Sequence, residues 1–166
     1  MDTNQPAKPA ATASQWVIFK LGVEEYGVPA TQVQEISRFT TVTHVPKMPK
    51  FIKGVFNLRG KIVPLLDLKE RFEIGAGAAT DQNQRVIVSF LGEQLIGLIV
   101  DDVSGVIRLP ADSVDPVPST LPKVDAEFLF GVGKLGERLV VLIDLAKMLS
   151  DIEQKLLANL EEPSGK

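Results

Sequence analysis

The sequence predicts a mainly β protein built from two small β-barrels that pack against each other. Short apolar and β-branched segments alternate with turn residues along most of the chain, which is typical of small barrels. The same order of segments occurs twice, which indicates a duplicated unit. Each copy supplies roughly five short strands and is too small to bury much apolar surface alone, so the two copies should pack together.

Two pairs of matching segments carry the duplication. Residues 15–36 align with residues 84–106 if the second copy is given one extra residue. Residues 54–68 (GVFNLRGKIVPLLDL) align with residues 131–145 (GVGKLGERLVVLIDL) without a gap. The same segments in the same order indicate two related halves, which can also exchange strands.

The predicted folded domain covers residues 14–161. Residues 1–13 are polar and rich in Ala, Pro and Thr, so we expect a disordered tail. The first copy takes residues 14–80 and the second takes residues 81–145. C-terminal helices follow at residues 144–161. Strand exchange would blur the boundary near residue 80.

The first elements follow from local patterns. Residues 15–22 (QWVIFKLG) and 26–29 (YGVP) predict two strands. Thr31 followed by Gln34 matches a capping box, so the spacing predicts a short helix over residues 31–37. Residues 39–50 predict one short strand and a loop because two prolines interrupt them, and residues 51–52 predict a turn of helix.

Residues 54–67 predict a β-hairpin around which the rest of the chain is organised. The turn falls at Arg59-Gly60, because Gly60 can adopt a positive φ without steric conflict. Gly54 and Gly60 are therefore predicted to be structural turn glycines. The polar side chains of the hairpin should lie at its tip or on its polar face: Asn57, Arg59 and Lys61.

Three helix starts are marked by capping residues. Asp67 should cap a short helix at residues 68–72, and Asp144 should cap another in LAKMLS. Ser150 with Glu153 is a further capping box that opens DIEQKLLANL, whose apolar residues fall on one face. This last helix either packs on its own barrel or docks a partner.

Composition excludes several classes of function. The chain has 18 basic and 21 acidic residues, a net charge of −3 and a pI near 5.2, which argues against a nucleic-acid platform. It has no cysteine, so it has no disulfide framework, no cysteine-based zinc site and no thiol nucleophile. No signal peptide and no apolar run long enough for a bilayer are present, so we expect a soluble cytoplasmic protein without direct membrane insertion.

The sequence contains no convincing catalytic or cofactor-binding motif. Residues 131–136 fit G-x-G-x-x-G, but a strand follows where a dinucleotide site needs a helix. Residues 54–61 resemble a phosphate-binding loop that is one residue too long. His44 is the only histidine and should be a surface or loop residue, and Asp101-Asp102 should be solvated at a strand end. We therefore expect no enzyme activity, no metal and no cofactor.

A polar pair distinguishes the two copies. Glu35 and Arg59 belong to the first copy, and the corresponding residues of the second copy are Gly105 and Gly136, give or take one residue at Gly105. A purely structural pair would more readily be kept in both copies, which points to a displayed binding site. An exposed ion pair within the protein is the alternative interpretation.

Specific motifs then identify a relationship. EEYGV, VQEI, FIKGV, NLRG followed by IVP and LDL, and VDDVSGV together resemble the CheW family of bacterial chemotaxis coupling proteins. The resemblance covers about residues 15–160. It implies two five-stranded SH3-like barrels packed around a shared core, in line with the duplication.

The resemblance also implies a function and partners. The chain would be a non-catalytic scaffold that joins the cytoplasmic tips of methyl-accepting chemotaxis receptors to the regulatory domain of the CheA histidine kinase, at membrane receptor arrays. The receptor-binding residues carried over are Val33, Glu35, Asn57 and Arg59. The kinase contact would use apolar patches at the barrel ends, whose residues the resemblance does not place. A small ligand-binding or enzymatic barrel, with its site in the groove between the barrels, is the alternative function.

Overall fold

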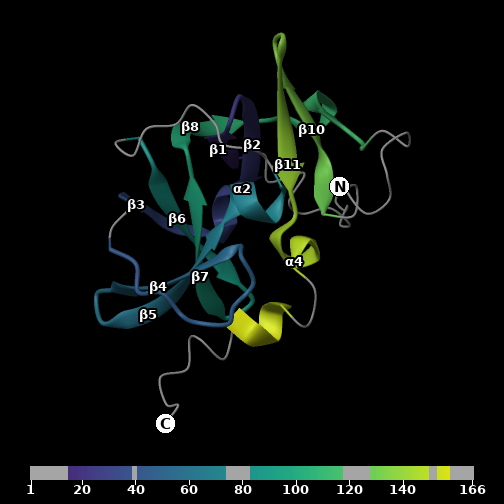
Figure 1. The fold of residues 1–166 in the computed structure, drawn as a ribbon. Coiled ribbons are helices and arrows are strands. Elements are labelled where there is room, and N and C mark those ends of the chain that lie inside the picture. Colours follow the sequence, from purple (N-terminus) through teal and green to yellow (C-terminus); the bar gives the residue numbers. More distant parts are fainter. Residues whose placement is uncertain (1–14, 39–40, 74–82, 118–127, 150–152, 158–166) are drawn as a thin grey trace.

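The computed structural model describes residues 15–38, 41–73, 83–117, 128–149 and 153–157. The predicted N-terminal tail and the Ser150 cap lie outside these residues. The described part is mainly β, as predicted, with short helical elements between strands and after the last strand (Figure 1). The strands are β1 (Gln15–Leu21), β2 (Glu24–Pro29), β3 (Val33–Arg38), β4 (Ile52–Leu58), β5 (Lys61–Asp67), β6 (Arg85–Leu91), β7 (Gln94–Val100), β8 (Asp102–Arg108), β9 (Val114–Asp115), β10 (Leu129–Leu135) and β11 (Arg138–Ile143). The helical elements are η1 (Ala30–Gln32), α2 (Leu68–Arg71), η2 (Ala111–Ser113) and α4 (Leu145–Met148).

The strands form two sheets, and each sheet combines both copies. The five-stranded sheet has the order β3-β6-β7-β5-β4, and the six-stranded sheet has the order β8-β1-β2-β11-β10-β9. β3 of the first copy pairs with β6 of the second, and β8 of the second pairs with β1 of the first. The copies have therefore exchanged strands. The predicted boundaries between the copies separate the two repeats in the sequence, but they do not separate the two sheets.

The strand registers show the duplication more exactly than the sequence alignment did. The pairing of β3 with β6 recurs as the pairing of β8 with β1, with every partner displaced by 70 residues, such as Val33 to Val103 (103 − 33 = 70). The parallel pairing of β5 with β7 recurs as that of β11 with β2: Leu65↔Gly97 corresponds to Leu142↔Gly27, displaced by 77 residues from β5 to β11 (142 − 65 = 77) and by 70 from β2 to β7 (97 − 27 = 70). The extra residue that the alignment required at this place is wrong, because the copies match here without a gap.

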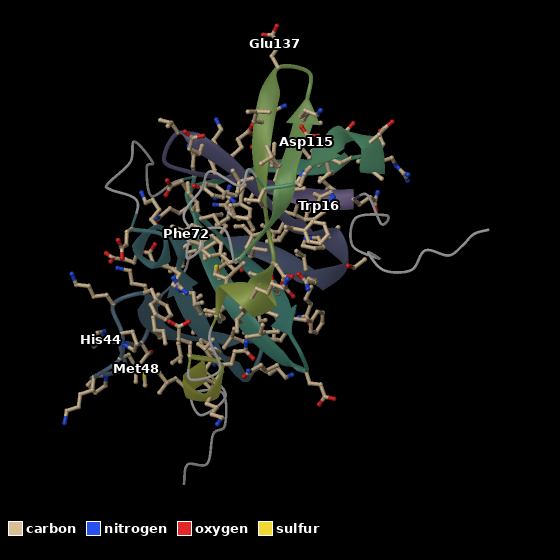
Figure 2. The ribbon with its side chains drawn as sticks, turned by 90° about the vertical axis from the view of Figure 1, so that its right-hand side faces the viewer. Trp16, His44, Met48, Phe72, Asp115 and Glu137 are labelled. Carbon is tan, nitrogen blue, oxygen red and sulfur yellow. The ribbon has the colours of Figure 1, made fainter. Side chains whose placement is uncertain are left out.

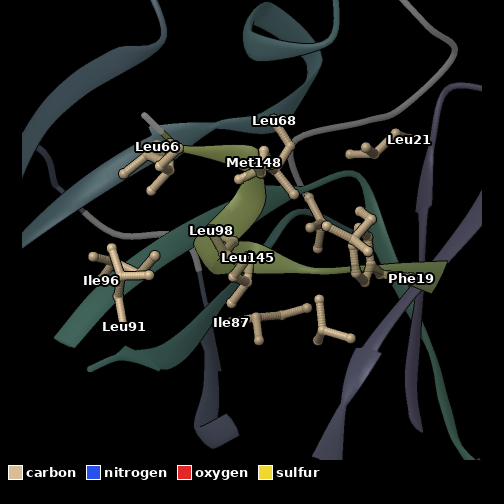
Figure 3. Packing of buried hydrophobic residues seen from close by; sticks show 14 of the residues in the cluster. Phe19, Leu21, Leu66, Leu68, Ile87, Leu91, Ile96, Leu98, Leu145 and Met148 are labelled. Carbon is tan, nitrogen blue, oxygen red and sulfur yellow. The ribbon is translucent and has the colours of Figure 1, made fainter. Parts of the chain in front are cut away.

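The apolar core has one shared cluster and one smaller cluster for each sheet. The shared cluster takes residues from both sheets and from α4, including Phe19 of β1, Leu98 of β7 and Leu145 of α4 (Figure 3). One smaller cluster gathers around Phe56 and Val63, and the other gathers around Trp16 and Leu142. Each sheet thus encloses a small apolar cluster of its own. The shared cluster holds the two sheets together, because the burial of apolar surface is the dominant favourable contribution to folding.

Two predicted helical segments are strands. The expected helix at residues 31–37 is wrong: η1 ends at Gln32, and β3 follows with half-buried and exposed side chains in strict alternation. Pairing with β6, which lies far away in sequence, outweighs the local capping pattern. The helical turn expected at residues 51–52 is also wrong, because Ile52 opens β4. Within described residues 41–50, the expected strand is reduced to a single bridge from Thr43 to Val55.

Two of the predicted capping residues, Asp67 and Asp144, are confirmed. The Asp67 carboxylate accepts hydrogen bonds from the amides of Lys69 and Glu70 at the start of α2. Asp144 accepts one from the Lys147 amide at the start of α4. Residues 153–157 are helical, and Leu157 is fully buried in the shared core, so this part of the last predicted helix packs on its own domain.

Asp101 differs from its prediction as a solvated residue. It is buried, its Oδ2 accepts a hydrogen bond of 2.7 Å from the Gly22 amide, and its Oδ1 lies 3.2 Å from Lys69 Nζ. It stands between β7 of one sheet and β8 of the other. Its two partners compensate for its burial and connect the corner between the sheets to the β1–β2 turn and to α2.

Gly54 is a structural glycine for a different reason from the predicted one. It lies inside β4 at a register irregularity and not in a turn, with a φ of 148°. A Cβ atom at this position would lie only 2.1 Å from the carbonyl oxygen of Thr43, whose amide and carbonyl both bond to Val55. The absence of a side chain therefore allows residues 41–43 to lie against the edge of β4.

Replacement of Gly54 by Ala should destabilise the protein more than the same change at Gly105. Gly105 has a similar φ of 141° but open space where a Cβ would lie, so it shares the backbone strain without the clash. We expect Gly54→Ala to lower the unfolding free energy by about 1–3 kcal/mol more than Gly105→Ala, measured by urea denaturation. Equal losses for the two variants would contradict the close approach to Thr43.

Candidate functional site

The turn between β4 and β5 consists of Arg59 and Gly60. Both residues have positive φ, 50° at Arg59 and 91° at Gly60, which is the pattern of a type I′ turn. The prediction for Gly60 is confirmed. The positive φ of Arg59 was not predicted, and it is uncommon for a residue that carries a Cβ.

Arg59 and Glu35 form a bidentate ion pair, which is the alternative interpretation that the sequence left open for this polar pair. Arg59 Nη1 donates a hydrogen bond of 3.0 Å to Glu35 Oε2, and Nη2 donates a second to Oε1. Glu35 lies on β3 and Arg59 directly follows β4, and these strands are the two ends of the five-stranded order. The pair therefore links the two edge strands of that sheet.

Arg59 and Glu35 each stabilise the charged form of the other. The hydrogen bonds from Arg59, helped by its positive charge, lower the pKa of the Glu35 carboxyl, although partial desolvation acts in the opposite direction. Glu35 in turn raises the pKa of the Arg59 guanidinium. Both groups are therefore charged at neutral pH, and 66% of the Arg59 side chain remains exposed to solvent.

Asn57 and Val33 are the other two predicted binding residues. Asn57 is exposed on β4, and its Oδ1 accepts a hydrogen bond of 2.7 Å from the Gly60 amide. Val33 is half-buried at the start of β3 and packs against the shared core. The structure thus brings Glu35, Asn57 and Arg59 together at the turn, whereas Val33 is partly used for packing beside them.

The second sheet carries an ion pair that the sequence comparison missed. Gly105 and Gly136 do occupy the positions of Glu35 and Arg59. A different arginine, Arg138 on β11, donates hydrogen bonds of 2.8–3.0 Å to Glu25 on β2, and Ser104 on β8 donates to the same carboxylate. Comparison of the copies could not find this pair, because its residues correspond to positions other than those of the first pair.

The described residues offer little for catalysis. They hold no group of three or more His, Asp or Glu side chains that could bind a metal ion. His44 is exposed in a loop, as predicted (Figure 2). The described residues that line a hollow beside β9 and α4 include Asp115, Asp144 and Lys147, and none of these described lining residues is a histidine, serine or threonine. The G-x-G-x-x-G segment lies in β10 and the turn after it, so it is a hairpin and not a phosphate site.

No helix within the described ranges is long and apolar enough to span a membrane.

The ion pair should be visible in the titration of Glu35. Because its folded-state pKa is lowered, the pair contributes stability above the unfolded-state pKa, and this contribution is lost as the pH falls through the folded-state pKa. We expect Arg59→Ala to raise the pKa of Glu35 toward that of an ordinary glutamate, as followed by NMR of the side-chain carboxyl. Arg138→Ala is the matched control and should leave the titration of Glu35 unchanged. An unchanged pKa in Arg59→Ala would contradict the pairing.

The sequence and the structure match one protein family. Residues 15–153 match the family model described as the CheW-like domain. The chain is 43% identical to the chemotaxis protein CheW of Klebsiella aerogenes over 146 residues, which covers 88% of this chain and 87% of the relative. It is 30% identical to protein FrzA of Myxococcus xanthus over 92% of this chain and 95% of the relative.

A solved structure supports the same relationship. The crystal structure of scaffolding protein TtCheW from Thermoanaerobacter tengcongensis superposes with a TM-score of 0.75 at 35% sequence identity, covering 82% of this chain and 92% of that one. The family match covers most of the chain and the fold agrees, with its two sheets around a shared core. The chain therefore belongs to the CheW-like domain family.

Proposed function

We propose that this chain couples methyl-accepting chemotaxis receptors to the CheA histidine kinase, and that the turn site around Arg59 binds the receptor tip. The chain is a chemotaxis scaffold, in keeping with its family and with relatives named chemotaxis protein CheW. The two partners and the site residues are the proposal. The enzymatic alternative has no support in the family or in the described side chains.

One observation carries the assignment of the receptor site: an arginine held in place but still open to a partner. The turn fixes the Arg59 backbone, and Glu35 fixes its guanidinium from β3, the strand at the other end of the sheet order. A guanidinium has five N–H donors, and two of them bond to Glu35, which leaves three for other acceptors. A rigid, exposed fork of donors suits carboxylates and carbonyls on a partner helix.

The surroundings of Arg59 also fit a protein partner. The side chain is 66% exposed at the end of a hairpin whose strands are anchored through Phe56 and Val63 in the apolar interior. Ile62 is a large apolar side chain exposed at 37%, on β5 just after the turn and opposite Asn57 in the strand register. A charged group bordered by modest apolar area is the composition found at protein interfaces.

The proposal predicts that Arg59→Ala weakens receptor binding without loss of the fold. The affinity for a receptor cytoplasmic fragment should fall on the order of 30-fold, the scale of an interface hot spot, while the melting temperature stays close to that of the parent. Arg59→Lys should recover part of the affinity, because lysine keeps the charge but not the planar fork. Isothermal titration against the receptor fragment and against the regulatory domain of the kinase measures both contacts.

Arg138→Ala provides the matched control, because Arg138 forms the same kind of exposed Arg–Glu pair in the six-stranded sheet. Its receptor affinity should stay near that of the parent, and the kinase affinity of Arg59→Ala should change much less than its receptor affinity. Equal receptor binding by Arg59→Ala and the parent would remove the support for this site. A loss that only follows unfolding would do the same.

A further inference from the structure

Four two-residue turns join antiparallel strand pairs among the described residues, and one of them differs from the rest. In three turns a glycine comes first and has the positive φ, and the second residue is not glycine, which is the pattern of a type II′ turn. In the β4–β5 turn the order is reversed, with Arg59 first and Gly60 second, and both have positive φ. The three regular turns are Gly22-Val23, Gly92-Glu93 and Gly136-Glu137.

The reversed order places a residue with a Cβ where the chain elsewhere uses glycine. A positive φ brings that Cβ close to the backbone, so it is disfavoured for arginine. The hairpin therefore needs an additional interaction to hold this turn. Asn57 supplies one: its Oδ1 accepts the hydrogen bond from the Gly60 amide at 2.7 Å.

The other three hairpins have no such interaction available. The residue two positions before the first turn residue is Lys20, Phe90 or Lys134, and none of these side chains has a hydrogen-bond acceptor. Among the four described hairpins, an acceptor thus occurs at this place only where the turn begins with a residue other than glycine. The acceptor side chain and the arginine with positive φ occur in the same hairpin. This indicates that Asn57 serves the conformation of Arg59 and not strand pairing in general.

We infer that Asn57 is a positioning residue: its side-chain carbonyl holds the reversed turn and so fixes the point from which Arg59 reaches Glu35 and the partner. This inference rests on the proposed function for the identity of the partner. It changes the predicted role of Asn57, which acts through the turn and not through its own contact with the receptor. Its amide donors are not needed for binding, whereas its acceptor oxygen is.

The test compares variants of the full chain that separate the acceptor from the amide donors. Asn57→Asp keeps an oxygen at the same place and loses the donors, Asn57→Ala loses both, and Asn57→Glu carries the same charge as Asn57→Asp on a longer arm. Two quantities are measured for each variant: the hydrogen exchange of the Gly60 amide by NMR, and the affinity for the receptor cytoplasmic fragment. Lys134→Ala is the matched control in the β10–β11 hairpin.

We expect Asn57→Ala to accelerate exchange of the Gly60 amide and to weaken receptor binding by about tenfold. Asn57→Asp should retain the protection of Gly60 and most of the affinity, and should bind more tightly than Asn57→Ala and Asn57→Glu. Lys134→Ala should change neither the exchange of the Glu137 amide nor receptor binding.

Three results would overturn the inference. Parental binding and exchange in Asn57→Ala would show that the acceptor is not needed. A loss of binding in Asn57→Asp as large as in Asn57→Ala, with Gly60 still protected, would show that Asn57 acts through its donors as a contact residue. Equal binding of Asn57→Asp and Asn57→Glu would show that the added charge governs the effect and not the acceptor position. If Arg59→Ala bound the receptor fragment as tightly as the parent protein, the proposed receptor site would be refuted instead. The hydrogen exchange of the Gly60 amide would then still test whether Asn57 holds the turn.

Discussion

The exchange of strands between the two copies is the constraint on which the rest of the structure depends. Each sheet is completed by strands of the other copy, through the β3–β6 and β8–β1 pairings and the parallel β5–β7 and β11–β2 pairings. Parallel pairing buries strands on both faces, and here Leu66 and Leu98 meet in the shared core. Neither sheet can form from one copy alone, so both hairpins belong to one domain that both copies build together.

On this nearly symmetric body the two hairpins have diverged. The β10–β11 hairpin turns at a glycine and projects from the fold (Figure 1), while the β4–β5 hairpin turns at Arg59 and is tied to β3 through Glu35. The duplication provides two equivalent places: the β4–β5 hairpin carries Arg59 and Asn57 where the β10–β11 hairpin carries Gly136 and Lys134. A fold that repeats itself can in this way present different side chains at equivalent hairpins.

Local signals in the sequence predicted what local interactions decide. The hairpin, the positive φ of Gly60 and the caps Asp67 and Asp144 follow from neighbours in the chain. The errors arose where distant partners decide: the capping pattern at Thr31 yields to pairing with β6, and the charge of Asp101 is buried because Lys69 and Gly22 meet it there. The Arg138–Glu25 pair was missed for the same reason, because only the parallel pairing of β11 with β2 brings it together.

The most direct test of the account is the footprint of the receptor on this protein. Backbone amide shifts of the full chain are recorded by NMR during titration with a receptor cytoplasmic fragment. We expect the largest changes at Glu35 on β3 and at Arg59 and Gly60 in the β4–β5 turn, with little change at Gly136 in the opposite hairpin. Changes centred on the β10–β11 turn, with the β4–β5 turn unaffected, would contradict it.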